Sequence, residues 1–356
     1  MAGRSDMEST LDEEAAHDLP RPRTIEEIAA ETGVSVTTVR LVINGQAERY
    51  RISARTRQAI EAYIARHGYV IDHAGRSLKL RRSDAVGCIV PDLANAHFAR
   101  LIAELEEQCR SRGLVLLTAS THEKPERERQ TVSGLLARGV DGIIIAPCEQ
   151  PEPSRFVRRG HRRVATVVID RAFPETVFPT VVGDNEAGAR RLTEQIMAES
   201  GGDVFFLGAR PDMPSIAARI RGFVEAFGSS DVGERILTEP EGDTASAGRR
   251  LMDDLLAALD GPPKSFISSS LLMLEGALQA LLDRFGSIPK EIILGTFDHH
   301  PLMELSANRV LSVRQDTVKI ASVAFNCLVD QMEGRGEMSS PLQIVPGALY
   351  ADRQRL

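Results

Sequence analysis

Residues 24–45 read TIEEIAAETGVSVTTVRLVING, and this stretch decides the fold of the amino-terminal part of the chain. Thr24 and Glu27 have the spacing of a capping box, in which the side chain of each residue satisfies the backbone N–H of the other. The helix that starts there is predicted to end at Gly33, because glycine adopts the left-handed conformation of a tight turn without strain. Ser35 then caps a second helix over 36–43. Two capped helices joined by a glycine turn are typical of a helix-turn-helix, whose second helix enters the major groove of DNA.

The charge of this region favours the same interpretation. A third helix is predicted between Ser53 and Gly68, and residues 21–82 hold twelve Lys and Arg against six Asp and Glu. Residues 1–20 hold one base and six acids, and residues 83–356 hold thirty bases and thirty-eight acids. A solvated charged face would show the same basic surplus, but the helix pattern favours nucleic acid. We therefore expect a DNA-binding domain over 23–70, preceded by a disordered acidic tail over 1–22.

The overall composition excludes several classes of protein. Hydrophobic residues make up 42% of the chain and charged residues 26%, which is typical of a folded globular protein. No apolar run approaches the roughly 18 residues that cross a bilayer, and the first twenty residues lack the apolar core of an export signal. We expect a cytoplasmic protein. The four cysteines lie far apart without a C-x-x-C pair, which predicts buried reduced thiols and neither a zinc site nor a disulfide framework. We expect no metal and no cofactor.

The sequence over 24–45, together with Arg-Thr-Arg at 55–57 and His-Gly-Tyr at 67–69, resembles the headpiece of LacI/GalR bacterial transcription regulators, and the resemblance continues over nearly the whole chain. The loop over 44–53 is most similar to the fructose repressor, or catabolite repressor-activator, branch of that family. The resemblance implies base contacts from three residues of the second helix and phosphate contacts from four others. The expected DNA-binding residues are Val36, Thr37 and Leu41 for bases, Ser35, Thr38, Asn44 and Tyr50 for phosphates, and in addition Thr24, Arg40, Leu78 and Lys79.

Arg40 stands where the family usually has a small residue. If Arg40 contacts a guanine edge, a bidentate pair would contribute roughly 1–3 kcal/mol of base discrimination. If it contacts a phosphate, it would add affinity without sequence information. The sequence leaves both roles open.

Residues 71–83 resemble the hinge helix of the family, and Leu78 stands at the position of the leucine that wedges into the minor groove. A short segment that contains Gly75 is expected to become helical only on DNA, because isolated helices below about 12 residues are marginal. The usual Asn-Pro pair before the hinge is Val70-Ile71 here. A plain basic linker is therefore the alternative.

From residue 84 onward, short apolar runs alternate with amphipathic helical patterns, in two successive series. This rhythm predicts an α/β fold with two Rossmann-like lobes, similar to a periplasmic binding protein, after the all-α headpiece. We assign 84–183 and 314–341 to the first lobe, and 184–313 and 342–356 to the second. A ligand is expected between the lobes, beyond the carboxyl ends of the strands. No G-x-G-x-x-G or Walker loop follows a strand, which argues against a dinucleotide enzyme or a kinase.

The resemblance also implies an effector site. Arg219 matches the arginine that binds the effector in this family, and Asp170 and Asp298 match carboxylates that bind sugar hydroxyl groups. Ser270-Leu271 stands where most members have an Asn-Asp pair that binds free sugars. Arg171 and Arg219 would supply two guanidinium groups to a phosphate, so a phosphosugar such as fructose 1-phosphate is the expected effector. For Arg171 the alternative is an ion pair with a neighbouring acid. The complete expected effector site is Asn95, His97, Phe98, Asp170, Arg171, Arg219, Ser270, Asp298 and Gln315.

These features predict a repressor of carbohydrate metabolism genes that binds a palindromic DNA operator as a homodimer, with a tetramer as an alternative assembly. Closure of the core on its effector would change the spacing of the paired hinges and weaken DNA binding. Two alternatives are a cytoplasmic sugar-binding protein and a regulator of the same fold that responds to a purine or nucleoside. The sequence has no G-x-S-x-G elbow, and we expect no catalytic residues and no enzyme.

Overall fold

The computed structural model describes residues 24–43, 45–68, 82–158, 163–228, 232–240, 242–335 and 342–351, and the backbone of 354–355. The chain separates into two compact units at the junction of Arg81 and Arg82. This junction falls within the segment 71–83 that the sequence assigns to the hinge. The acidic tail, Asn44, Leu78 and Lys79 lie outside the described residues.

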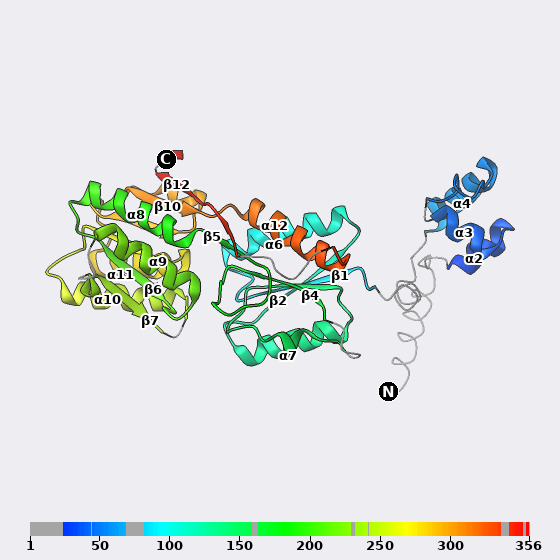
Figure 1. Cartoon of the computed structure of the whole chain (residues 1–356). Coiled ribbons are helices and arrows are strands. Elements are labelled where there is room, and N and C mark those ends of the chain that lie inside the picture. The colour runs from blue at the N-terminus through cyan, green and yellow to red at the C-terminus, as the bar shows by residue number, and fades with distance from the viewer. Residues whose placement is uncertain are drawn as a thin grey trace, which may run out of the picture. The chain divides into compact units, whose positions relative to one another are not determined.

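The amino-terminal unit contains the expected helices, which are α2 (Ile25–Thr32), α3 (Val36–Ile43) and α4 (Ala54–His67) (Figure 1). The capping box forms: the Thr24 N–H donates to Glu27 Oε2 at 3.0 Å, and the Glu27 N–H donates to Thr24 Oγ1 at 3.2 Å. Gly33 ends α2 with a φ of 67°, in the left-handed region. One fully buried residue from each helix, Ile28, Val39 and Ile60, forms the centre of the core. These contacts fix α3 against its two neighbours.

The first lobe of the carboxyl-terminal unit is a six-stranded parallel sheet with the order β11-β5-β4-β3-β1-β2. Helices α6 (Ala96–Ser111) and α12 (Thr317–Met332) pack on one face, and α7 (Pro125–Ala137) with the short helix η1 (Pro153–Phe156) packs on the other (Figure 1). The six strands are almost wholly buried in the middle of the sheet and partly exposed at its two edges, as expected of a sheet covered on both faces. They are β1 (Ala85–Val90), β2 (Val115–Ser120), β3 (Gly142–Ile145), β4 (Ala165–Ile169), β5 (Thr180–Gly183) and β11 (Gln343–Val345).

The second lobe is a seven-stranded sheet with the order β13-β12-β10-β9-β8-β6-β7. Its strands β6 to β10 are parallel, and β12 runs antiparallel to β10. Helices α8 (Asn185–Ser200) and α9 (Pro214–Phe227) cover one face, and α10 (Ala245–Ala258) and α11 (Leu271–Phe285) cover the other. The strands are β6 (Phe205–Ala209), β7 (Ile236–Glu239), β8 (Ser265–Ser268), β9 (Ile293–Phe297), β10 (Val310–Arg314), β12 (Ala348–Ala351) and β13 (Gln354–Arg355), and the short helices are η2 (Gly233–Arg235) and η3 (Pro301–Leu305).

One boundary of the expected lobes is wrong. The sequence assigned 342–356 as a whole to the second lobe, but Gln343–Val345 forms β11 and pairs in parallel with β5 of the first lobe, with Ile344 opposite Val182. This strand covers the backbone groups at the edge of β5, which would otherwise be unpaired. The chain therefore crosses to the second lobe only after Val345. A three-residue strand is too short for its hydrophobic pattern to indicate its partner.

The two lobes together produce the α/β core that the sequence predicts. Each sheet is built from strand–helix repeats, so the carboxyl ends of the strands of each sheet lie along one edge. Among the described helices, none is long and apolar enough to cross a membrane.

Candidate functional site

The exposed surface of α3 carries several of the expected DNA-binding residues. Ser35, Thr37 and Arg40 are exposed, whereas Thr38 and Leu41 are half-buried. Ser35 caps the helix, because its Oγ accepts from the Thr38 N–H at 3.1 Å. The two hydroxyl oxygens of Ser35 and Thr38 are 2.8 Å apart. These short polar side chains therefore lie together at the amino-terminal end of α3, where backbone N–H groups favour a phosphate.

Val36, which the resemblance assigns to a base contact, is less exposed than Thr37. It is half-buried and packs against the core of the three helices. After α3, Tyr50 is 54% exposed, and the guanidinium carbon of Arg49 lies 5.9 Å from the centre of its ring. Thr24 is exposed, but its hydroxyl is engaged in the capping box. The surface available to bases on α3 thus centres on Thr37, with Arg40 one turn further along.

A cavity of about 240 Å³ lies in the carboxyl-terminal unit, at the carboxyl ends of strands from both lobes. All nine residues of the expected effector site line it, although they come from six separate places between residues 95 and 315. Five further ionisable residues of the lining were not included in the expected site. They are Asp92, His122, Glu123, Arg210 and Asp243.

Arg219 is held rigidly in the wall of this cavity. Its Nε donates to Asn185 Oδ1 at 2.8 Å, and its Nη1 donates to the carbonyl oxygen of Ser269. The guanidinium carbon also lies 4.1 Å from the centre of the Phe297 ring, in a cation–π contact. No described residue hydrogen-bonds its Nη2. A guanidinium fixed on three sides is pre-organised to bind an anion through its remaining nitrogen.

Arg171 is paired with an acid of the cavity. Its guanidinium makes a two-pronged contact with the carboxylate of Glu123, and its Nη1 also donates to the carbonyl oxygen of Pro147 at 2.9 Å. Its Nε lies 3.6 Å from Asp170 Oδ2. Burial lowers the pKa of Arg171, but the charges of Glu123 and Asp170 outweigh burial and hold that pKa above its usual value. The ion pair that the sequence left as an alternative is therefore present, with an acid 48 residues away in the chain.

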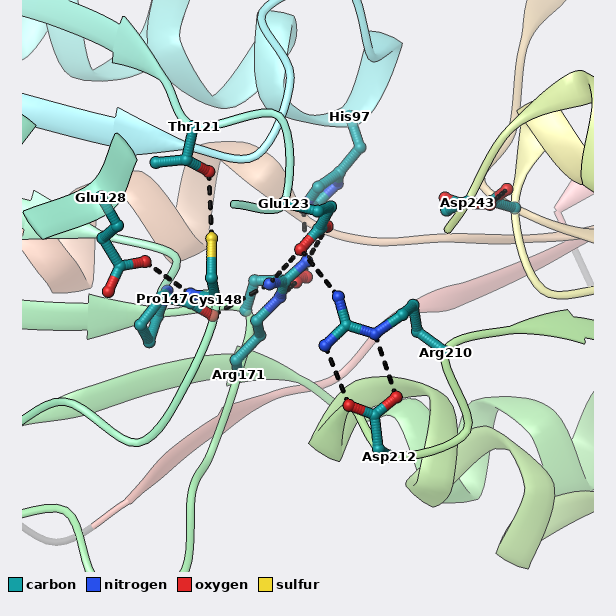
Figure 2. A network of polar contacts seen from close by, with 12 residues as sticks. His97, Thr121, Glu123, Glu128, Pro147, Cys148, Arg171, Arg210, Asp212 and Asp243 are labelled. Carbon is teal, nitrogen blue, oxygen red and sulfur yellow. Dashed lines mark hydrogen bonds and ion pairs between the residues drawn. The ribbon is translucent and has the colours of Figure 1, made fainter. Parts of the chain in front are cut away.

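Glu123 also faces the second lobe. It follows β2 in a loop where both His122 and Glu123 have a positive φ, of 50° and 57°. Its Oε2 lies 3.5 Å from Nη1 of Arg210, which follows β6. Figure 2 shows the Glu123 carboxylate between the guanidinium groups of Arg171 and Arg210. Arg210 in turn donates to both carboxylate oxygens of Asp212, at 3.0 and 2.9 Å, and these hydrogen bonds lower the pKa of Asp212.

The remaining expected residues form a cluster around the buried His97. Its Nε2 lies 3.7 Å from Asp170 Oδ1, and its Nδ1 lies 3.7 Å from Asp298 Oδ2. Gln315 donates to Asp298 Oδ1 at 2.9 Å and lies 3.3 Å from His97 Nδ1. Carboxylate oxygens accept from hydroxyl groups, and imidazole and amide groups can both accept from and donate to them. No set of three or more His, Cys, Asp or Glu in the described part of the chain is placed to hold a metal ion.

Ser270 and Asp243 form a further polar pair at the second lobe. The Ser270 hydroxyl donates to Asp243 Oδ1, and the Ser270 oxygen accepts from the Met273 N–H at 3.1 Å as the cap of α11. Burial of the carboxyl group raises the pKa of Asp243, and the Ser270 hydrogen bond and the charge of Arg219 oppose this increase. Ser270 therefore caps a helix and also positions a carboxyl group that sequence reasoning missed.

Glu123 and Asp243 share a sequence signal that could have identified them. Each follows a predicted strand by a few residues, β2 for Glu123 and β7 for Asp243, as Asp170 follows β4. The rule that a ligand binds beyond the carboxyl ends of the strands applies to these two acids as it does to Asp170.

Comparisons with known proteins support both parts of this arrangement. Residues 24–72 match a family model described as bacterial regulatory proteins, lacI family, and residues 86–336 match one described as a periplasmic binding protein domain. The two matched regions correspond to the three-helix unit and to most of the two-lobed unit.

The individual proteins that this chain resembles are named as regulators of catabolism or of sugar operons. The catabolite repressor/activator of Escherichia coli K12 is 31% identical over 291 residues, which are 82% of this chain and 86% of that protein. The sucrose operon repressor of Klebsiella pneumoniae is 29% identical over 321 residues, which are 90% of this chain and 95% of that protein. The crystal structure of the Cra transcriptional dual regulator of Pseudomonas putida, in complex with fructose 1-phosphate, is similar with a TM-score of 0.69. It is 27% identical and covers 76% of this chain and 99% of that chain.

Proposed function

Because the chain belongs to the LacI family of bacterial regulatory proteins, it is a DNA-binding transcription regulator, and we propose that it represses genes of carbohydrate metabolism. It binds a palindromic operator as a homodimer, because two-fold protein symmetry matches two-fold symmetry in the DNA. The exposed residues Thr37 and Arg40 on α3 support the expected contact with the major groove. A regulator of this kind acts in the cytoplasm, the location that the sequence predicts.

The effector of this regulator is a phosphosugar, of which fructose 1-phosphate is the first candidate. One observation carries this proposal: Arg171 and Arg219 line the same cavity as His97, Asp170 and Asp298. Guanidinium groups suit a phosphate, and the other three side chains suit the hydroxyl groups of a sugar. The likeness to a Cra regulator in complex with fructose 1-phosphate supports the same class of ligand.

The effector acts by changing the equilibrium between two arrangements of the core. A ligand bound between the lobes stabilises the arrangement that it fits better, and it can shift DNA affinity only by that difference in affinity. The connection over 71–83, including Leu78 and Lys79, transmits this change to the headpieces over 23–70. The proposal assigns no catalytic role to the cavity, because its polar groups are paired for binding and no nucleophile is identified in the sequence.

Fluorescence anisotropy on the DNA upstream of its own gene tests this function. The purified protein should bind this duplex far more tightly than a scrambled duplex at the same salt concentration, since nonspecific binding depends steeply on salt. Fructose 1-phosphate should release the specific complex, and fructose should not at the same concentration. Release by a purine or nucleoside alone would replace the phosphosugar with the second class of effector. Equal affinity for both duplexes would contradict operator recognition.

A further inference from the structure

Two of the three arginines that line the cavity are already occupied by a carboxylate of the protein. Glu123 contacts Arg171 of the first lobe with both of its oxygens, and its Oε2 lies 3.5 Å from Nη1 of Arg210 of the second lobe. Figure 2 shows this bridge, with Asp212 on the far side of Arg210. The carboxylate thus lies where an anionic group of a ligand would meet both guanidinium groups.

Arg171 already uses three of its five N–H donors within the protein. Arg171 is only 6% exposed. Its Nη1 donates to Glu123 and to the Pro147 carbonyl oxygen, and its Nη2 donates to Glu123. Its Nε is buried without a hydrogen-bond partner and is 3.6 Å from the Asp170 carboxylate. A phosphate can therefore gain a two-pronged contact with the Nη1–Nη2 edge of Arg171 only if Glu123 moves away.

The charges around the cavity strengthen this requirement. Three arginines line the cavity together with five carboxyl groups, those of Asp92, Glu123, Asp170, Asp243 and Asp298. A phosphate monoester carries a charge of about −1.5 to −2 at pH 7, so it would be repelled from this lining while the Glu123 carboxylate lies against two of the three arginines. A neutral sugar does not encounter this obstacle.

Glu123 lies on the side of the first sheet that is away from the connections between the lobes. It follows β2, which is the edge strand of the first sheet, whereas β5 and β11, which lead into the connections between the lobes, lie at the opposite edge. Arg210 follows β6, which is separated from β10 and its connection by β8 and β9. The Glu123–Arg210 contact therefore joins the two lobes on the side of the cavity away from the connecting segments.

We propose that Glu123 is an internal competitor for the anionic group of the effector, and that the effector must displace its carboxylate from Arg171 and Arg210. This inference rests on the proposed phosphosugar effector. Displacement makes Glu123 a specificity determinant: a phosphate dianion competes with the carboxylate for the two guanidinium groups, whereas an unphosphorylated sugar leaves the bridge in place.

The test is calorimetric titration of the full-length protein and of Glu123→Gln with fructose 1-phosphate, fructose and inorganic phosphate. Glutamine keeps the shape of the side chain and removes its charge. The variant should bind fructose 1-phosphate about tenfold or more tightly than the wild type, because a like charge at the binding position costs more than one tenfold step in affinity. Its affinity for fructose should stay within about twofold.

Glu149→Gln is a matched control. Glu149 also contacts two arginines, Arg129 at 2.8 Å and Arg155 at 2.5 Å, but it does not line the cavity. Glu149→Gln should leave all three affinities unchanged. If both variants gain affinity, the gain is a general effect of lost negative charge and the competitor role is overturned.

The other outcomes separate the inference from the proposed function. If the wild type binds fructose 1-phosphate and Glu123→Gln binds it equally or more weakly, the competitor role is overturned and the effector stands. If neither protein binds fructose 1-phosphate, the proposed effector is wrong, and the titration with inorganic phosphate tests the competitor role. A higher affinity for inorganic phosphate in Glu123→Gln alone supports that role. An unchanged affinity for inorganic phosphate overturns it.

A second variant covers the case in which Glu123→Gln does not fold. Arg210→Gln removes the arginine that is nearer to solvent and should weaken fructose 1-phosphate binding about tenfold while leaving fructose binding unchanged. If it changes both affinities by the same factor, Arg210 does not receive the phosphate and the competitor role is overturned.

Discussion

The Nε of Arg219 donates a hydrogen bond to Oδ1 of Asn185 at 2.8 Å, and this contact joins the middle of α9 to the first residue of α8. Both side chains are buried. Because α8 begins directly after the connection from β5, the orientation of Arg219 is fixed relative to the place where the chain enters the second lobe. The proposed effector arginine is therefore tied to a segment that joins the lobes.

We expect Arg219→Ala to abolish the response to the effector and to leave operator binding intact. Loss of a charge-assisted contact to phosphate should weaken effector binding by roughly 10- to 100-fold. Titration of the operator complex with fructose 1-phosphate measures both properties. Arg221→Ala is the control on the same helix, because Arg221 is exposed and pairs with Glu186 on the surface. An Arg219→Ala variant that is released at the same phosphosugar concentration as the wild type would show that the effector binds elsewhere.

Arg40 is expected to contact a phosphate of the operator. It is exposed on α3, and about half to two-thirds of protein–DNA hydrogen bonds go to phosphate and sugar oxygens, with arginine among their donors. Arg40→Ala should therefore weaken specific and nonspecific binding by similar factors and should reduce the slope of log K against log salt by about 1. Anisotropy titrations at several salt concentrations measure this slope. A loss confined to the specific duplex would instead indicate a guanine contact.

Features that depend on neighbours in the sequence could be predicted. The capping box of Thr24 and Glu27, the turn at Gly33 and the cap at Ser35 all form, because each requires only residues within one helical turn. The alternation of strands and helices predicts the two lobes for a similar reason, since each strand–helix unit has its own hydrophobic period. The same rule placed Asp170 and Asp298 at strand ends, and both line the cavity.

Features that depend on distant pairing could not be predicted. The acid that neutralises Arg171 lies 48 residues earlier, in a loop whose path depends on left-handed backbone conformations at His122 and Glu123. Nothing in the local sequence requires a non-glycine residue to adopt that conformation. Strand β11 was assigned to the wrong lobe because its three residues become a strand only by pairing with β5.

Gly222 should be intolerant of a side chain. It lies on α9 where that helix meets α8, and a Cβ at this position would overlap the carbonyl oxygen of Glu186. Gly222→Ala should separate the two helices and reduce the free energy of unfolding by about 1–3 kcal/mol, as overpacked cores do. Urea denaturation measures the change. Gly233→Ala is the matched control, because its Cβ would meet no atom within 4 Å. Equal stability of Gly222→Ala and the wild type would mean that the helix contact is looser than described.

Asp243 gives the core a stability that depends on pH. Its pKa is raised by burial, with Ser270 and Arg219 opposing the increase, so the folded state holds the Asp243 proton more tightly than the unfolded state does. A group of this kind contributes its full stability below the unfolded pKa, which is about 3.9 for aspartate, and loses it as the pH rises through the folded pKa. Asp243→Asn keeps a polar partner for the Ser270 hydroxyl and never ionises. The variant should therefore be more stable than the wild type near neutral pH, and this advantage should shrink as the pH falls towards 4. Thermal unfolding at a series of pH values measures the difference, with Asp283→Asn on the exposed surface of α11 as the control. An advantage that stays constant with pH would mean that Asp243 does not titrate differently in the two states.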